Sequence, residues 1–177
     1  MLNQNDTLVL MIDIQEKLVN SLNKTTIVSK AEKVLNAAKI LDIPILVTEQ
    51  YPKGLGNTVD SLQNIINEPA FEKTYFNVLL EEGFLDKIRS YGKKQIVIMG
   101  IETHICVYQT ALALLDEGFE VYVVKDACAS RNKYEFKQGI NGMQAEGAKI
   151  TCVEIVLFEW LKGAKHPKFK EVQALIK

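Results

Sequence analysis

Short, almost continuous apolar runs of strand length constrain the fold of this chain more than any other feature. Six segments follow this pattern, the third of them abbreviated: residues 7–14, 43–48, 71–75, 95–100, 120–125 and 149–153. Strands that are apolar throughout, instead of alternating apolar with polar residues, are typical of parallel sheets that are buried on both faces. The pattern therefore favours a parallel sheet over an antiparallel one.

Stretches with apolar residues at helical spacing separate these runs. The expected helices are residues 27–41, 58–67, 78–91, 105–117, 134–146 and 154–161, and Pro167 is expected to open a C-terminal helix. Because helices alternate with the strands, we predict an α/β fold with three layers, α/β/α, in which helices cover both faces of a mostly parallel six-stranded sheet. We expect a single domain over residues 1–177.

Composition and charge narrow the class of protein. The chain has 177 residues, of which 47% are hydrophobic and 24% charged, as in globular domains. Its 21 basic and 22 acidic residues give a net charge of −1, which argues against nucleic acid as a partner. No apolar run approaches the roughly 18 residues of a membrane span, and the N-terminus lacks the basic region of a signal peptide. We expect a cytoplasmic protein without a membrane partner.

Cys106 is a candidate nucleophile because it follows the apolar run at residues 95–100. Ligands of parallel sheets bind outside the carboxyl ends of the strands. In the first turn of the following helix, free backbone N–H groups and the helix dipole favour a thiolate. If Thr103 caps that helix, neighbouring amides remain available to hold an anion. A small buried structural cysteine fits the same sequence equally well.

Two further strand ends carry charged residues. Asp13 ends the first apolar run, where it could shuttle a proton or cap the following helix. Lys73 stands among aromatic residues, and composition alone favours a solvated surface lysine there. Cysteine, carboxylate and lysine from separate strand ends can nevertheless converge in one crevice as nucleophile, base and electrostatic support.

The segments around these three residues resemble the catalytic blocks of the isochorismatase-like cysteine hydrolase superfamily. They are Val9-Leu-Met-Ile-Asp-Ile-Gln15, Phe71-Glu-Lys-Thr-Tyr-Phe76 and Gly100-Ile-Glu-Thr-His-Ile-Cys-Val107. Residues 126–131, 147–151 and 156–161 are similar to later blocks of that superfamily, so the resemblance covers nearly the whole chain. Residues 47–56 and 166–173 are most similar to its isochorismatase domain-containing subgroup.

The resemblance implies specific roles for residues of this chain. Asp13, Lys73 and Cys106 form the catalytic triad, the Ile101–Glu102 peptide is cis, and the amides of Glu102 and Cys106 make an oxyanion hole. The implied activity is hydrolysis of a small amide-like C–N substrate through a thioester, and the presence of the cysteine favours this over vinyl-ether hydrolysis. The implied substrate contacts are Gln15, Gln50, Phe76, Ile101 and His104.

No metal or other cofactor is expected. Nicotinamidases of the superfamily carry an acid and histidines after the second strand to bind a metal, whereas residues 48–56 contain no histidine. We therefore predict neither a catalytic metal nor nicotinamide as substrate.

Two other function classes remain open at this stage. The chain could be a silent member of the fold that acts as a binding or scaffold protein, or a thiol redox protein that pairs Cys106 with Cys128 or Cys152. The expected partners are a small-molecule substrate and further copies of the chain, which could cover the apolar side chains of Tyr108, Phe158 and Trp160.

Overall fold

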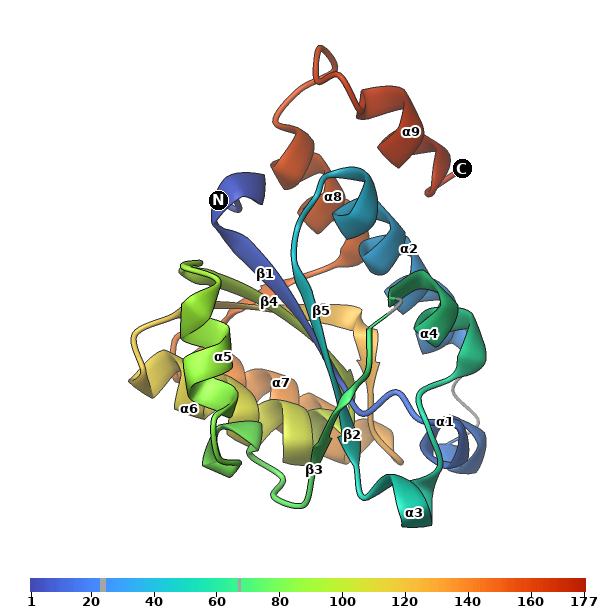
Figure 1. Ribbon diagram of the computed structural model, residues 1–177, viewed down its shortest axis with the longest axis vertical. Coiled ribbons are helices and arrows are strands. Elements are labelled where there is room, and N and C mark those ends of the chain that lie inside the picture. The colour runs from blue at the N-terminus through green and yellow to red at the C-terminus, as the bar shows by residue number, and fades with distance from the viewer. Residues whose placement is uncertain (23–24, 67) are drawn as a thin grey trace.

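A six-stranded parallel sheet forms the centre of the protein (Figure 1). The computed structural model describes residues 1–22, 25–66 and 68–177, and within them the strand order is β3-β2-β1-β4-β5-β6, with each neighbouring pair parallel. The strands are β1 (Thr7–Ile12), β2 (Ile45–Gln50), β3 (Phe71–Lys73), β4 (Gln95–Ile101), β5 (Glu120–Ala129) and β6 (Lys149–Thr151).

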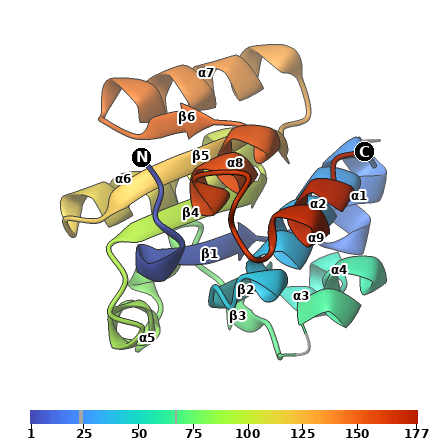
Figure 2. The ribbon, with the colours of Figure 1, turned by 90° about the horizontal axis from the view of Figure 1, so that it is seen from above.

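Helices cover both faces of this sheet. They are α1 (Glu16–Leu22), α2 (Thr26–Ile40), α3 (Pro52–Leu55), α4 (Asp60–Ile66), α5 (Phe84–Ser90), α6 (Tyr108–Asp116), α7 (Lys133–Ala145), α8 (Val153–Leu161) and α9 (Phe169–Ala174). Three shorter turns complete the order, η1 (Gln4–Asp6), η2 (Val78–Leu80) and η3 (Thr103–Val107). Seen from above, α2, α8 and α9 lie on one face and α5, α6 and α7 on the other (Figure 2). The predicted three-layer α/β/α fold is confirmed.

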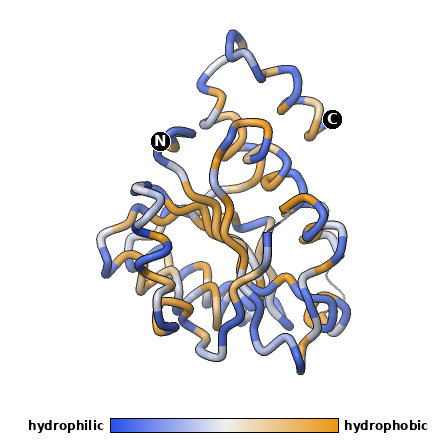
Figure 3. The backbone as a smooth tube through the Cα atoms, viewed as in Figure 1, coloured by the Kyte–Doolittle hydropathy of each residue, from blue (hydrophilic) through white to orange (hydrophobic). Residues whose placement is uncertain are grey.

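The two central strands explain why the apolar runs are continuous. Every residue of β1 and of β4 is buried, because helices cover both faces of the sheet. Figure 3 shows the apolar strands at the centre, with polar segments toward the outside. None of the helices in the described part of the chain is long and apolar enough to cross a membrane.

Several element boundaries differ from those predicted. The helix expected over 78–91 is wrong, because Gly83 takes a left-handed φ of +77° and separates η2 from α5. The predicted end of the helix over 58–67, Asn67, lies outside the described residues. Strand β5 continues to Ala129 instead of ending at residue 125, so Asp126 lies within the strand and not after it.

One of the three apolar residues expected at a subunit contact is internal. Trp160 is only 1% exposed, and its indole N–H donates to Thr7 Oγ1 at 3.2 Å. Phe158 is exposed as expected, and Tyr108 is half-buried. The prediction that Trp160 lies at the surface is therefore wrong, because its side chain is on the buried face of α8.

Gly100 allows β1 and β4 to approach closely at their carboxyl ends. It lies opposite Ile12 in the register of the two strands and has a φ of +142°, which side chains rarely permit. A Cβ atom there would stand 2.0 Å from the carbonyl oxygen of Ile12. The strand ends that carry Asp13 and the turn toward Cys106 are therefore close together only because residue 100 is glycine.

Substituting this glycine provides a test of that constraint. We expect Gly100→Ala to lower the free energy of unfolding by at least about 3 kcal/mol, because the methyl group meets backbone and the φ is strained. Gly163→Ala is the matched control, since a Cβ at Gly163 meets no atom within 4 Å. Urea unfolding of the two variants measures the difference, and equal stabilities would contradict the close-approach argument.

Candidate active site

The three candidate catalytic residues lie at or after the carboxyl ends of three parallel strands, β1, β3 and β4. Asp13 directly follows β1, Lys73 is the last residue of β3, and Cys106 lies in η3 after β4. The order of the strands reverses between β1 and β4, and open α/β sheets bind ligands in the crevice at such a switch point. The topology thus brings the three residues to one end of the sheet.

Asp13 and Lys73 form a buried ion pair. Asp13 Oδ2 lies 2.7 Å from Lys73 Nζ, and neither side chain is exposed to solvent. Asp13 Oδ1 accepts a hydrogen bond of 2.6 Å from Thr48 Oγ1. The backbone of Asp13 has a φ of +50°, in the left-handed region that aspartate tolerates better than most residues. Two neighbouring strand ends, those of β1 and β2, therefore fix this carboxylate.

The ammonium group of Lys73 uses all three of its donor positions. Besides the ion pair with Asp13, Nζ donates to Gln50 Oε1 at 2.6 Å and to the Tyr75 carbonyl at 3.2 Å. Burying an unpaired charge costs several kcal/mol, and a paired charge with complete hydrogen bonds avoids most of that cost. Lys73 is thus a structural and electrostatic element of the site, in contrast to the solvated lysine that composition alone favours.

Gln50 holds Lys73 in place. It lies beside Lys73 in the register of β2 and β3, and its Nε2 donates to the Thr74 carbonyl at 2.8 Å while Oε1 accepts from Lys73. The side chain of Gln15 accepts a hydrogen bond of 2.8 Å from the backbone N–H of Gln50 through Oε1, and it donates one of 2.6 Å to the Gly56 carbonyl through Nε2. Both glutamines therefore order the strand ends and the segment after β2.

The Cys106 thiol is buried beside the ion pair. It is 7% exposed. Burial and the negative charge of Asp13 raise its pKa to about 12, and the positive charge of Lys73 only partly opposes them. The expectation that a helix start favours a thiolate is therefore wrong for the resting protein, in which the sulfur keeps its proton. The Asp13 carboxylate is the acceptor available to take that proton.

The turn that carries Cys106 is not an ordinary helix start. The Ile101–Glu102 peptide is cis, and η3 is a five-residue π-helix that precedes α6. Thr103 does not cap it, since its buried Oγ1 has no hydrogen-bond partner among the described residues. Gly139 of α7 lies against the turn, where a Cβ would stand 2.9 Å from the Cα atom of His104. Helix α7 thus supports the turn from outside.

Glu102 and Arg131 form a second ion pair at the site. The Glu102 carboxylate accepts from the Arg131 backbone amide at 3.0 Å, from Nε at 3.2 Å and from Nη2 at 2.7 Å. Burial acts to raise the pKa of Glu102, but these hydrogen bonds hold the pKa below its usual value. The carboxyl group is therefore ionised at neutral pH and its charge is matched by Arg131.

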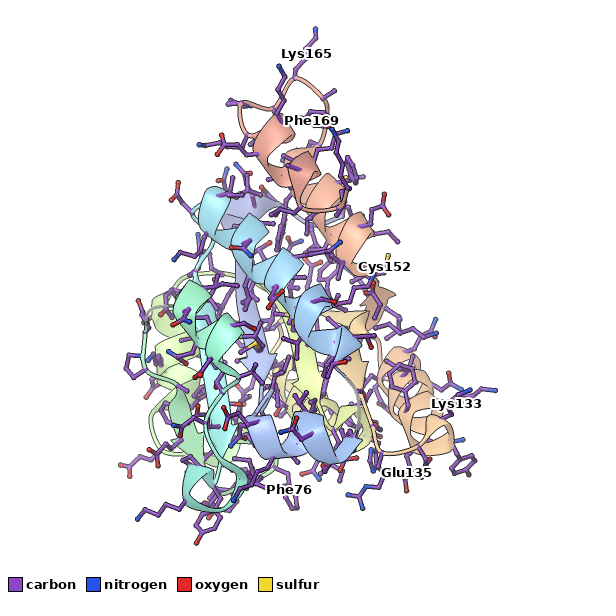
Figure 4. All side chains as sticks on the ribbon, turned by 90° about the vertical axis from the view of Figure 1, so that its right-hand side faces the viewer. Phe76, Lys133, Glu135, Cys152, Lys165 and Phe169 are labelled. Carbon is purple, nitrogen blue, oxygen red and sulfur yellow. The ribbon has the colours of Figure 1, made fainter. Side chains whose placement is uncertain are left out.

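A cavity of about 200 Å³ opens beside the thiol. Its lining comprises Asp13, Leu18, Gln50, Leu55, Phe76, Ile101, Glu102, Ile105, Cys106 and Arg131. Phe76, which is 52% exposed, lies at the end of the molecule where α1 and α3 also lie (Figure 4). Of the implied substrate contacts, the structure therefore brings Gln50, Phe76 and Ile101 to the cavity.

Gln15 and His104 do not line this cavity. The side chain of Gln15 is fully buried, and its polar atoms are used in the hydrogen bonds to Gln50 and Gly56. The ring of His104 contacts Ser130 Oγ at 3.0 Å and lies 3.8 Å from Glu135 Oε2, at a separate surface hollow beside α7. Within the described residues, no group of three or more His, Cys, Asp or Glu side chains is arranged to hold a metal ion.

Four lining residues were missed by sequence reasoning. Arg131 follows the carboxyl end of β5, and predicting that strand to end at residue 125 concealed this position. Leu18, Leu55 and Ile105 are apolar residues in or beside helices. One sequence contains no signal that separates an apolar helix residue facing the core from one facing a cavity.

Fold and site together define a Rossmann-like three-layer domain with a cysteine, a carboxylate and a lysine at its switch point. The model of the Isochorismatase domain family matches residues 7–155. Isochorismatase domain-containing protein 2 of Xenopus laevis is 42% identical over 99% of this chain and 85% of its own length. The chain therefore belongs to the isochorismatase domain family, whose hydrolase fold it shares, and the resemblance found in the sequence is confirmed.

Other similar proteins differ in length and in description. Isochorismatase domain-containing protein 1 of Salmo salar is 38% identical over 97% of this chain, which spans only 61% of that protein. A MAR1 ribonuclease from Caenorhabditis elegans superposes with a TM-score of 0.93 at 37% identity, covering 99% of this chain and 91% of that chain. YcaC from Pseudomonas aeruginosa, described with hexane-2,5-diol and covalent acrylamide, superposes with a TM-score of 0.92 at 25% identity. The superposition covers 98% of this chain and 90% of that chain.

The coupling between Asp13 and Lys73 can be measured through stability. Replacing Lys73 by Met leaves a buried carboxylate without its partner, so we expect a loss of about 3–5 kcal/mol. The double variant Asp13→Asn/Lys73→Met should recover part of that loss, because neither charge remains. Urea unfolding of the wild type, both single variants and the double variant gives the coupling energy. Additivity within about 0.5 kcal/mol would contradict a buried ion pair.

Proposed function

We propose that this protein is a cysteine-dependent hydrolase that cleaves the C–N bond of a small amide through a thioester. The observation that carries the proposal is the buried Asp13–Lys73 ion pair, which lies beside the protonated Cys106 thiol at a small cavity. A carboxylate that is paired with an ammonium group next to a thiol is the arrangement that general-base activation of a nucleophile requires.

In the first half of the reaction, Asp13 takes the proton from Cys106 as the sulfur attacks the amide carbon. A C–S bond forms, and the carbonyl oxygen becomes an oxyanion. We assign its stabilisation to the backbone amides of Glu102 and Cys106, following the family pattern. The C–N bond then breaks, and the leaving nitrogen receives the proton from Asp13, so that ammonia or an amine departs.

In the second half, water hydrolyses the thioester. Asp13 accepts a proton from the water as its oxygen attacks the carbonyl carbon, and the C–S bond breaks. The sulfur then regains the proton from Asp13, which restores the thiol and releases a carboxylic acid. The net change is amide plus water to acid plus amine, without any external oxidant or reductant.

Lys73 is assigned an electrostatic role in both halves. As the proton moves from sulfur to Asp13, the negative charge passes from the carboxylate to the sulfur, and the ammonium can stabilise the charge at either place. Its hydrogen bonds to Gln50 and to the Tyr75 carbonyl hold the ammonium group in place while the negative charge moves from Asp13 to the sulfur.

The comparisons add support for a nucleophile in this fold. Acrylamide is an electrophile that thiolates attack, and the Pseudomonas aeruginosa relative is described with covalent acrylamide. By analogy, we take Cys106 to be the nucleophile of this chain.

The ribonuclease named among the relatives provides a second candidate function. The net charge of −1 and the cavity of about 200 Å³ favour a small molecule over a polynucleotide. Incubation with RNA compares the two candidates directly. Cleavage by the wild type that is lost in Cys106→Ala would favour the ribonuclease.

The nucleophile itself is tested with Cys106→Ala. We expect amide hydrolysis to fall by about 10³-fold or more, because no other thiol lines the cavity. Cys128→Ala is the matched control, since Cys128 is equally buried but lies outside that lining. Mass spectrometry of the rapidly quenched intact protein should show an acyl adduct on the wild type and on Cys128→Ala. Full activity of Cys106→Ala would rule out the mechanism.

A further inference from the structure

The polar side chains that line the cavity are already paired with groups of the protein. Asp13 is bound by Thr48 and Lys73, and both ends of the Gln50 amide are used on β3 and the residue after it. The Glu102 carboxylate is occupied by three hydrogen bonds from Arg131. Among the buried polar side chains of the described lining, the Cys106 thiol is left for the reacting group, and Asp13 Oδ2 beside it has the Lys73 ammonium as its partner.

The charges around the cavity cancel in the same way. Each buried carboxylate has one cation, Lys73 for Asp13 at 2.7 Å and Arg131 for Glu102 at 2.7 Å. The Arg131 guanidinium donates to Glu102 through Nε and Nη2, so a carboxylate bound to its remaining N–H groups would meet a cation whose charge Glu102 already matches. Without a free cation, desolvating a charged ligand carries a large cost.

The remaining wall is apolar. Leu18 of α1, Leu55 of α3, Ile101 of β4, Ile105 of η3 and Phe76 make up the other half of the lining. The volume of about 200 Å³ limits the ligand to a small one, since a water molecule occupies about 30 Å³ of liquid. Apolar walls gain free energy by removing apolar ligand surface from water.

We propose that the substrates of this cavity are small, uncharged amides whose acyl group is apolar. The inference rests on the proposed amide hydrolysis and adds the chemistry of the acyl group to it. It excludes substrates whose acyl part carries a carboxylate, because the charge of each cation in or beside the lining is already matched by a buried carboxylate.

A series of simple amides tests this directly. We expect kcat/KM for ammonia release to rise about fourfold for each methylene from acetamide through propionamide to butyramide, as each CH₂ leaves water. Succinamate replaces the terminal methyl group of butyramide by a carboxylate, and we expect it to react at least about 100-fold more slowly. Cys106→Ala provides the background rate for every amide.

Leu55 offers a variant that changes the preference without disturbing the core. It is half-buried and lies outside the hydrophobic core of the described residues. Leu55→Lys places a free cation in the wall, so the ratio of succinamate to butyramide kcat/KM should rise about tenfold or more. Leu80→Lys is the matched control, since Leu80 is 61% exposed and outside the lining, and it should leave that ratio unchanged.

The outcomes separate this inference from the proposed function. Hydrolysis that depends on Cys106 but prefers succinamate, or ignores chain length, overturns the apolar acyl site and leaves the amide hydrolase intact. Rates at the Cys106→Ala background for all of the amides overturn both. A rise with chain length, together with the shift in Leu55→Lys alone, supports both.

Discussion

The buried ion pair between Asp13 and Lys73 is the constraint on which the rest of this site depends. Two charges without solvent contact are tolerated only if each is opposed by the other and every remaining donor or acceptor is used. Thr48, Gln50 and the Tyr75 carbonyl meet that requirement. As a result, the ends of β1, β2 and β3 are held together around a carboxylate and an ammonium group. Separating these two groups would leave buried charges without partners, at a large cost in free energy.

This pair determines the state of the neighbouring thiol. An unopposed lysine would lower the pKa of Cys106 and favour a thiolate, but burial and the Asp13 carboxylate outweigh it, so the resting Cys106 is protonated. The site therefore stores its negative charge on Asp13, where it can act as a base, and the charge reaches the sulfur only during attack. Because the charges of Glu102 and Arg131 also cancel, the net charge around the cavity is close to zero, and its reactive groups face mostly apolar walls.

Much of this arrangement was predictable from the sequence, because buried parallel strands leave continuous apolar runs and their carboxyl ends mark the ligand side. That reasoning, together with the resemblance to the catalytic blocks of the superfamily, singled out Asp13, Lys73 and Cys106 as candidates. It could not show that Gln50 is bound to Lys73, since that contact depends on the register of β2 and β3. It also misjudged the thiol, because a local helix-start argument omits a carboxylate that is distant in sequence. Arg131 was missed because β5 continues past a register shift beside Gly100 and ends at Ala129. The carboxyl end of β5, and with it the position of Arg131, therefore lies further along the chain than predicted.

The central claim is that burial and the Asp13 carboxylate together keep Cys106 protonated until attack. The most direct measurement is the rate of iodoacetamide alkylation at each cysteine as a function of pH, resolved by peptide mass spectrometry. For Cys106 in the wild type, the rate should keep rising well beyond pH 8.5, the usual thiol pKa, in line with a value of about 12. In Asp13→Asn the Cys106 profile should shift to lower pH, because burial alone then opposes the effect of Lys73. The profile of Cys128, whose pKa burial raises to about 12, should be unchanged. A plateau for Cys106 below pH 8.5 in the wild type, or a profile that Asp13→Asn does not move, would contradict the account.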